Sequence, residues 1–136
     1  MTPAQIEEAR RWVALRGWRW MPGMSAGEPG KRGGVSHFAR IQRIRKSDGM
    51  IWCLHERHGF VPMSYVCGQE PVPDVTDPAT RGCLLTLARE ITQRPGLNAV
   101  DLGDSDWWCV MLEARASSES EVWLKACEHH EREVTS

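Results

Sequence analysis

The sequence predicts an α+β fold in which three helices pack, sandwich-like, on a mainly antiparallel sheet of about five to six strands. Helix-capping signals open segments near both ends of the chain and in its second half. Two short turn sequences, Asp48-Gly49 and His58-Gly59, separate runs that alternate as strands do. Strands joined by short turns and flanked by helices are typical of α+β proteins.

Length and composition predict a single globular domain over residues 1–136. Hydrophobic residues make up 41% of the chain and charged residues 26%, and the formal net charge is −1. The molecule as a whole therefore has no strong field to attract nucleic acid or acidic lipid. The five cysteines form no Cys-x-x-Cys motif, which favours free thiols in a reducing compartment. The polar N-terminus and the lack of a long apolar stretch predict a soluble, intracellular protein.

The first helix is predicted to begin at Pro3. Thr2 is its N-cap, and Gln5 completes a capping box. Glu8 belongs to the polar face, and Gly17 is expected at the C-terminal end.

The segment after this helix is predicted to hold one short strand and then a loop. Residues 18–21 alternate as a strand does. Residues 22–34 contain five glycines and two prolines among thirteen positions, a density of helix and strand breakers that favours a mobile surface loop.

A three-stranded meander is expected between residues 39 and 66. With two-residue loops at 48–49 and 58–59, side chains from the three strands would align in rows across one face. Pro62 must lie on an edge or at a bulge, because it cannot donate to a ladder. The expected rows are Arg45, Trp52 and Tyr65, then Arg43, Leu54 and Met63, with Ile44, Cys53 and Ser64 on the opposite face.

Residues 68–76 are predicted to be a linker that does not divide the chain into domains. The clearest helix follows, with Asp77 as its cap, Pro78 in its first turn and a stop at residues 95–96.

The last third of the chain is predicted to form an antiparallel pair, residues 98–102 and 107–112, and a final helix. Ser118 and Glu121 form a capping box that opens this helix. The predicted order of elements is therefore α-β-β-β-β-α-β-β-α. Val122, Trp123, Ala126 and Cys127 are expected to face inward.

A run of cations without any acid is the main functional signal. Such a patch could bind phosphates or an acidic protein surface, and it could also be a solvated strand face that charge protects against edge pairing. The run comprises Lys31, Arg32, Arg40, Arg43, Arg45 and Lys46.

Seven tryptophans are present, and each could pack in a core or stack on a ligand. Their positions in the pattern predict that Trp12, Trp18, Trp20, Trp52 and Trp123 are buried. Only one member of the adjacent pair Trp107 and Trp108 can point inward from a strand. The other is expected to be an interface residue.

Metal sites and catalysis find little support in the sequence. Cys53, His55, His58 and Cys67 are zinc-type ligands, as are Cys127, His129 and His130, but their spacing is loose. Asp101, Asp104 and Asp106 are most simply a turn. No catalytic motif is present, so we expect no enzyme activity, no metal and no cofactor.

Three stretches resemble small phage and prophage proteins of uncharacterised function: EARRWVALRGWRWMPGM, VPDVTDPATRGCLLTLARE and SSESEVWLKACEHHE. The layout after residue 76 is also similar to that of phage ABA sandwich domains. The resemblance carries structural positions and no catalytic residues. It implies a phage accessory gene, and such genes often act against the host by binding.

The resulting hypothesis is a non-enzymatic protein that inhibits a host defence component, for example a CRISPR effector, in the bacterial cytoplasm. Arg40, Arg43, Arg45 and Lys46 would supply charge complementarity, and Trp107 or Trp108 would anchor the contact. A protein that sequesters a nucleotide signal and a nucleic-acid-binding protein are the alternatives. The near-neutral charge counts against the last of these.

Overall fold

The computed structural model describes residues 1–30, 34–67, 70–103, 106–109 and 114–135. It is an α+β protein, as predicted, with a five-stranded antiparallel sheet, a separate three-stranded sheet and four helices in the described ranges. Contacts divide the chain into two compact units, residues 1–13 with 20–83 and residues 14–19 with 84–136. We describe each unit by itself.

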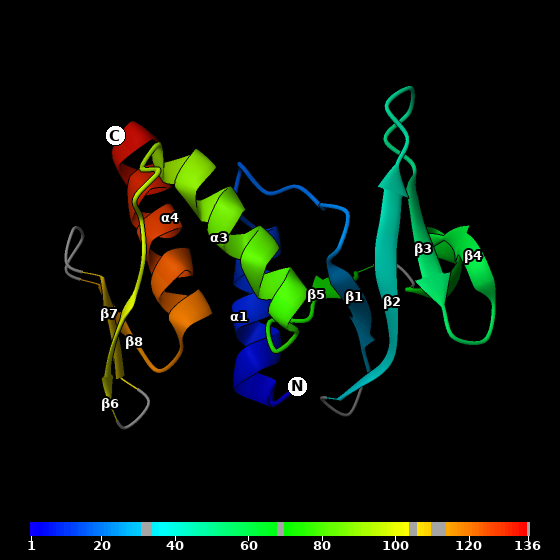
Figure 1. Ribbon diagram of the computed structural model, residues 1–136, viewed down its shortest axis with the longest axis horizontal. Helices are drawn as coiled ribbons and strands as arrows, with labels where there is room; N and C mark the ends of the chain where they lie inside the picture. The colour runs from blue at the N-terminus through cyan, green and yellow to red at the C-terminus, as the bar shows by residue number, and fades with distance from the viewer. Residues whose placement is uncertain (31–33, 68–69, 104–105, 110–113, 136) are drawn as a thin grey trace. The chain divides into compact units, whose positions relative to one another are not determined.

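The first unit is built on the five-stranded sheet, drawn from blue to green in Figure 1. Its strand order is β4-β3-β2-β1-β5, and every neighbouring pair is antiparallel. Pro62 ends the edge strand β4, as its missing N–H requires. The strands are β1 (Ser25–Pro29), β2 (Val35–Ile44), β3 (Ile51–His55), β4 (Gly59–Pro62) and β5 (Val72–Pro73).

Strand β1 lies inside the segment that was expected to be a loop, so that prediction is wrong for residues 25–29. Ser25, Ala26 and Gly27 are all buried. Their small side chains allow neighbouring backbone to approach closely, and pairing with both β2 and β5 satisfies the strand's polar groups. The expected linker at 68–76 likewise contains β5, with Val72 buried.

The register of the meander differs from the predicted one. The Arg45 N–H donates to the Met50 carbonyl at 2.9 Å, so the first turn spans four residues instead of two. A bulge between Ile41 and Arg43 then shifts the pairing by one position. The resulting rows are Arg43, Trp52 and Pro62, then Arg40, Leu54 and Phe60, with Ile41, Cys53 and Val61 on the opposite face.

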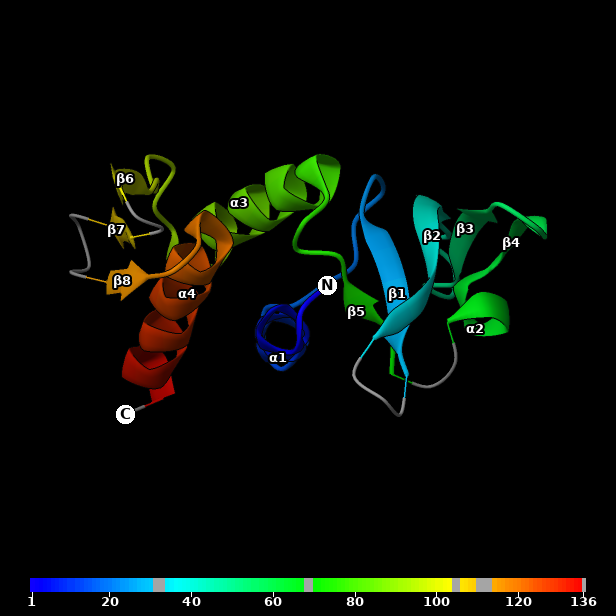
Figure 2. The same cartoon turned by 90° about the horizontal axis from the view of Figure 1, so that it is seen from below.

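The third strand of the meander is shorter than expected, because residues 63–66 form the helical turn α2 (Met63–Val66). Met63 and Tyr65 therefore join no row. Figure 2 shows α2 beside the strands β2 to β4, which it contacts. Met63 is buried there, and the Cys67 thiol lies 3.8 Å from the Ala26 carbonyl, so α2 covers one face of the sheet.

Helix α1 (Pro3–Val13) begins with the predicted capping box. The Thr2 hydroxyl accepts the Gln5 N–H at 3.2 Å, and the Gln5 amide oxygen accepts the Thr2 N–H at 2.7 Å. Glu8 is buried instead of solvated, because its carboxylate accepts the indole N–H of the fully buried Trp12. No strand forms over residues 18–21.

Helix α3 (Pro78–Thr92) starts at the predicted cap. The Asp77 carboxylate accepts the Thr80 N–H at 2.9 Å and the Thr80 hydroxyl at 2.8 Å. The Thr80 hydroxyl oxygen also accepts the Ser25 N–H of β1 at 2.8 Å. The start of α3 is thereby joined to the sheet within the first unit.

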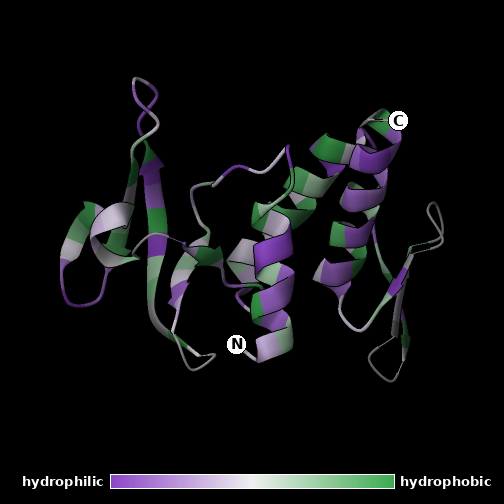
Figure 3. Ribbon diagram, turned by 180° about the vertical axis from the view of Figure 1, so that it is seen from behind, coloured by the Kyte–Doolittle hydropathy of each residue, from purple (hydrophilic) through white to green (hydrophobic). Residues whose placement is uncertain are grey.

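The second unit contains the rest of α3, the sheet β6-β7-β8 and helix α4 (Glu119–Thr135). Its strands are β6 (Val100–Gly103), β7 (Asp106–Cys109) and β8 (Ala114–Ala116), of which β8 was not predicted. Figure 3 shows hydrophobic and hydrophilic residues alternating along α4. The expected inward side chains are buried, namely Val122, Trp123, Ala126 and Cys127.

Gly17 follows α1 by four residues instead of ending it. A Cβ at this position would lie 2.7 Å from Cγ1 of Ile91. The Glu131 carboxylate also accepts the backbone N–H groups of Arg16 and Gly17, each at 2.9 Å. The glycine therefore allows close packing within the second unit.

Candidate functional site

The described residues of the basic run fall into two groups, those paired with an acid and those without an acidic partner in the described ranges. Arg40 belongs to the first group. Its guanidinium donates two hydrogen bonds to the Asp77 carboxylate, both at 2.9 Å, and a third to the Gly23 carbonyl at 2.8 Å. The pair lowers the pKa of Asp77 to about 2. Arg40 therefore joins β2 to the start of α3, and much of its charge is compensated.

Arg45 is balanced by an acid of its own turn. Its guanidinium donates to Asp48 at 3.0 and 2.6 Å. The Asp48 carboxylate also accepts the Met50 N–H at 3.0 Å, and the hydrogen bond from Arg45 holds the pKa of Asp48 below its usual value. These contacts fix the turn between β2 and β3.

Arg43 and Lys46 form the second group. Both are exposed, and within the described ranges neither forms an ion pair. The bulge places Arg43 opposite Trp52, on the side of the sheet that α2 does not cover. Lys31 and Arg32 lie outside the described residues.

The two candidate tryptophans of β7 are both half-exposed. Trp107 shares a strand face with Cys109, which is buried, and Trp108 lies opposite Val100, which is 47% exposed. Trp108 is therefore the outward member of the pair.

An apolar surface that the sequence reasoning missed lies on β2, β3 and β4, on the side opposite α2. We call it the open face, and it consists of Phe38, Trp52, Leu54 and Phe60. The Trp52 and Phe60 rings stack with centroids 5.2 Å apart. Leu54 is 53% exposed, Phe60 54% and Phe38 37%. Toward β1, Ser25 is buried and Arg40 is paired with Asp77, whereas Leu54 on β3 and Phe60 on β4 are exposed to solvent.

The open face also corrects the expectation for the tryptophans. Trp12 and Trp123 are buried as predicted, but Trp18, Trp20 and Trp52 are half-exposed. Trp18 and Trp20 have no strand to carry them inward, and Trp52 lies on the open face. The apolar side chains at 52, 54 and 60 are the available signal in the sequence, and of these only Trp52 was predicted to be buried.

The zinc-type residues near the β3–β4 turn form a different arrangement. The His55 ring stacks on His58 at 4.9 Å, and its Nδ1 accepts the Arg57 and His58 N–H groups at 3.1 and 3.3 Å. Burial raises the pKa of Cys53 to about 11 and that of Cys67 to about 12. No group of three or more metal-binding side chains was found among the residues that the structure describes.

Comparison of the chain with models of protein families, with curated proteins and with solved structures finds no match. In the described part of the chain, no helix has the length and apolar character that a membrane span needs.

Proposed function

We propose that this chain is a non-enzymatic binding protein that docks on an acidic partner protein through the open face and the adjacent cations Arg43 and Lys46. The observation that carries the proposal is the open face itself. Its four large side chains lie on the same side of the sheet, with Trp52 and Phe60 stacked, beside two cations that lack acidic partners in the described ranges.

The apolar surface supplies the driving force for docking. Fully burying an exposed Leu or Phe side chain contributes roughly 1.5–3 kcal/mol, and since Leu54 is 53% and Phe60 54% exposed, docking would gain roughly half of this for each. Monomeric proteins rarely leave large contiguous apolar patches in water, and such patches mark interaction sites. Aromatic residues and arginine are also the side chains that dominate binding energy in interfaces.

The charge beside this surface selects the partner's chemistry. Arg43 lies opposite Trp52 in the sheet, and Lys46 lies in the turn that follows β2. Among the described residues neither side chain has an acidic partner, so a partner with an apolar centre and an acidic margin complements them. A second copy of this chain would instead bring like charges together.

Nucleic acid is a poorer partner for this surface. Two of the arginines that a phosphate backbone would need are held by Asp77 and Asp48. The formal net charge of −1 gives the whole chain no compensating attraction.

The biological role follows from the resemblance to phage and prophage proteins. On that basis the partner is a host defence component in the bacterial cytoplasm, such as a CRISPR effector, and binding inhibits it. This step rests on analogy with proteins of that origin.

The test measures phage plaquing on bacteria that carry CRISPR–Cas systems and express the chain. The wild-type chain is expected to restore plaquing of a targeted phage by orders of magnitude. The double variant Leu54→Glu, Phe60→Glu is expected to lose this effect, since it places acids on the open face. Val134→Glu is the matched control, because Val134 is 69% exposed in the second unit.

Two results would contradict the proposal. One is full restoration of plaquing by the double variant. The other is no restoration by the wild-type chain in any strain of a panel that covers several defence systems. Thermal unfolding of each variant shows whether a loss of effect reflects a loss of fold.

A further inference from the structure

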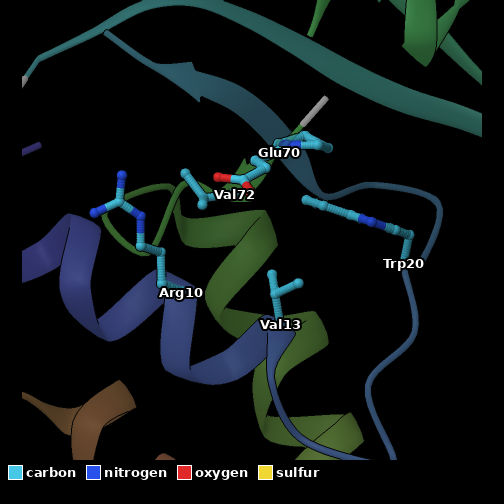
Figure 4. A pocket seen from close by; sticks show the side chains of 6 residues that line it. Arg10, Val13, Trp20, Glu70 and Val72 are labelled. Carbon is cyan, nitrogen blue, oxygen red and sulfur yellow. The ribbon is translucent and has the colours of Figure 1, made fainter. Parts of the chain in front are cut away.

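A cavity of about 290 Å³ lies in the first unit, between α1 and the segment that leads into β5. Arg10 and Val13 line it from α1, and Glu70, Pro71 and Val72 line it from the other side. Figure 4 shows the Trp20 indole extending toward Val72 and Glu70, with Arg10 across the cavity from Trp20.

We infer that this cavity binds a small zwitterion with an apolar body, of the class of the free apolar and aromatic α-amino acids. The inference is independent of the open face, which shares no residue with the cavity.

The chemistry of the lining supports this class. A guanidinium binds a carboxylate through two parallel hydrogen bonds, and a carboxylate accepts hydrogen bonds from an ammonium group. Arg10 and Glu70 thus offer one group of each sign. Neither forms an ion pair or hydrogen bond with another described residue. Both residues are exposed, so a ligand in the cavity can reach them.

The apolar part of the lining would hold the ligand's side chain. Val13, Pro71 and Val72 offer aliphatic surface, and the indole of Trp20 offers an aromatic one. An indole also attracts a nearby ammonium group through its π-electrons. A purely polar ligand would leave this surface without a partner.

Size and charge disfavour a nucleotide here. Ligand pockets usually measure roughly 300–1,000 Å³, so this cavity suits a molecule at the small end of the range. A phosphate would also face the carboxylate of Glu70, and its negative charge would be repelled.

The experiment is titration calorimetry of the intact chain with L-phenylalanine as the probe. Three further compounds are titrated for comparison. Phenethylamine lacks the carboxylate of L-phenylalanine, 3-phenylpropanoate lacks its ammonium group, and adenosine monophosphate represents the nucleotides. L-Phenylalanine is expected to bind, and each analogue with a single charge is expected to bind about tenfold more weakly.

Two variants assign the charges. Arg10→Gln is expected to weaken L-phenylalanine binding about tenfold and to leave the affinity for phenethylamine unchanged. Glu70→Gln should also weaken L-phenylalanine binding about tenfold and leave the affinity for 3-phenylpropanoate unchanged. Arg57→Gln and Glu56→Gln are the matched controls, because both residues are exposed in the β3–β4 turn.

Amide chemical shifts provide a second measurement that does not depend on heat. L-Phenylalanine is expected to shift the amide resonances of Glu70 and Val72 and to leave those of Glu56 and Arg57 in place. The inference is overturned if L-phenylalanine gives neither heat nor shifts at millimolar concentration. It is equally overturned if adenosine monophosphate binds more tightly, or if the controls weaken binding as much as Arg10→Gln.

Discussion

Arg40 and Asp77 form a two-point ion pair that links strand β2 to the N-terminus of helix α3. The same carboxylate caps the helix through the N–H and hydroxyl of Thr80. The Asp77 side chain is 15% exposed, whereas that of Arg40 is 42% exposed. One acid therefore stabilises both the helix start and its attachment to the sheet, at the border of the open face.

Replacement of Asp77 is expected to destabilise the protein. Asp77→Ala removes a helix N-cap and leaves Arg40 without its acidic partner, which together cost about 2 to 3 kcal/mol. Urea unfolding of the two proteins measures the difference. A change below about 0.5 kcal/mol, the level typical of ordinary surface substitutions, would show that the contact is not formed in solution.

The Asp77 contribution is also expected to depend on pH. Its pKa falls from 3.8 to about 2 in the folded protein, mainly because of the hydrogen bonds from Arg40. The folded state binds the proton less tightly than the unfolded chain, so the ionised group stabilises the fold above about pH 4 and this contribution is lost as the pH falls toward 2. The stability difference between wild type and Asp77→Asn should shrink over that interval. A difference that stays constant with pH would contradict this assignment.

Two glycines are expected to respond in opposite directions to alanine. Gly59 has a φ of +69° at the start of β4, a conformation that costs an L-residue about 1 to 2 kcal/mol. Gly82 lies in α3 with open space around its missing Cβ, so alanine should stabilise the helix by about 0.5 to 1 kcal/mol. Thermal unfolding should show a lower Tm for Gly59→Ala and a higher Tm for Gly82→Ala. Equal shifts in the same direction would be inconsistent with these backbone assignments.

Thiol reactivity tests the burial of the cysteines. Cys53, Cys67 and Cys127 are buried, and burial raises their pKa to about 11, 12 and 12. Cys109 is also buried, whereas Cys83 is half-exposed. A thiol reagent at neutral pH should label Cys83 first in the native protein, because reaction needs an accessible thiolate. Cys83→Ser should remove the fast phase, and a fast phase that survives this substitution would show that a second thiol is accessible.

Local signals correctly predicted the helix starts, because these depend on residues that are close together in the sequence. The capping box of Thr2 and Gln5, the cap at Asp77 and the start of α4 after Ser118 all form as expected. Each is decided within a few residues along the chain, so each can be inferred from spacing alone.

Strand β1 could not be predicted in this way. Its glycine and proline content argues for a loop, and it becomes a strand because β2 and β5 pair with it on both sides. Tertiary pairing outweighs local propensity at this position.

The candidate site was only partly accessible from the sequence. The run of cations is visible in the sequence. The acids that compensate Arg40 and Arg45, namely Asp77 and Asp48, are identified only by the contacts in the folded chain. The position of Arg43 beside Trp52 depends on the bulge between Ile41 and Arg43, which no residue pattern predicts. A one-residue shift in register moves side chains to the other face of a strand.

Site-specific photocrosslinking tests the central claim most directly. A photoreactive amino acid at position 54 should crosslink the chain to an acidic bacterial protein in cells where the chain relieves defence. The same group at position 134 should not, and Arg43→Glu should abolish the crosslink from position 54. Relief of defence without any crosslink from the open face would contradict the claim that this surface binds the partner.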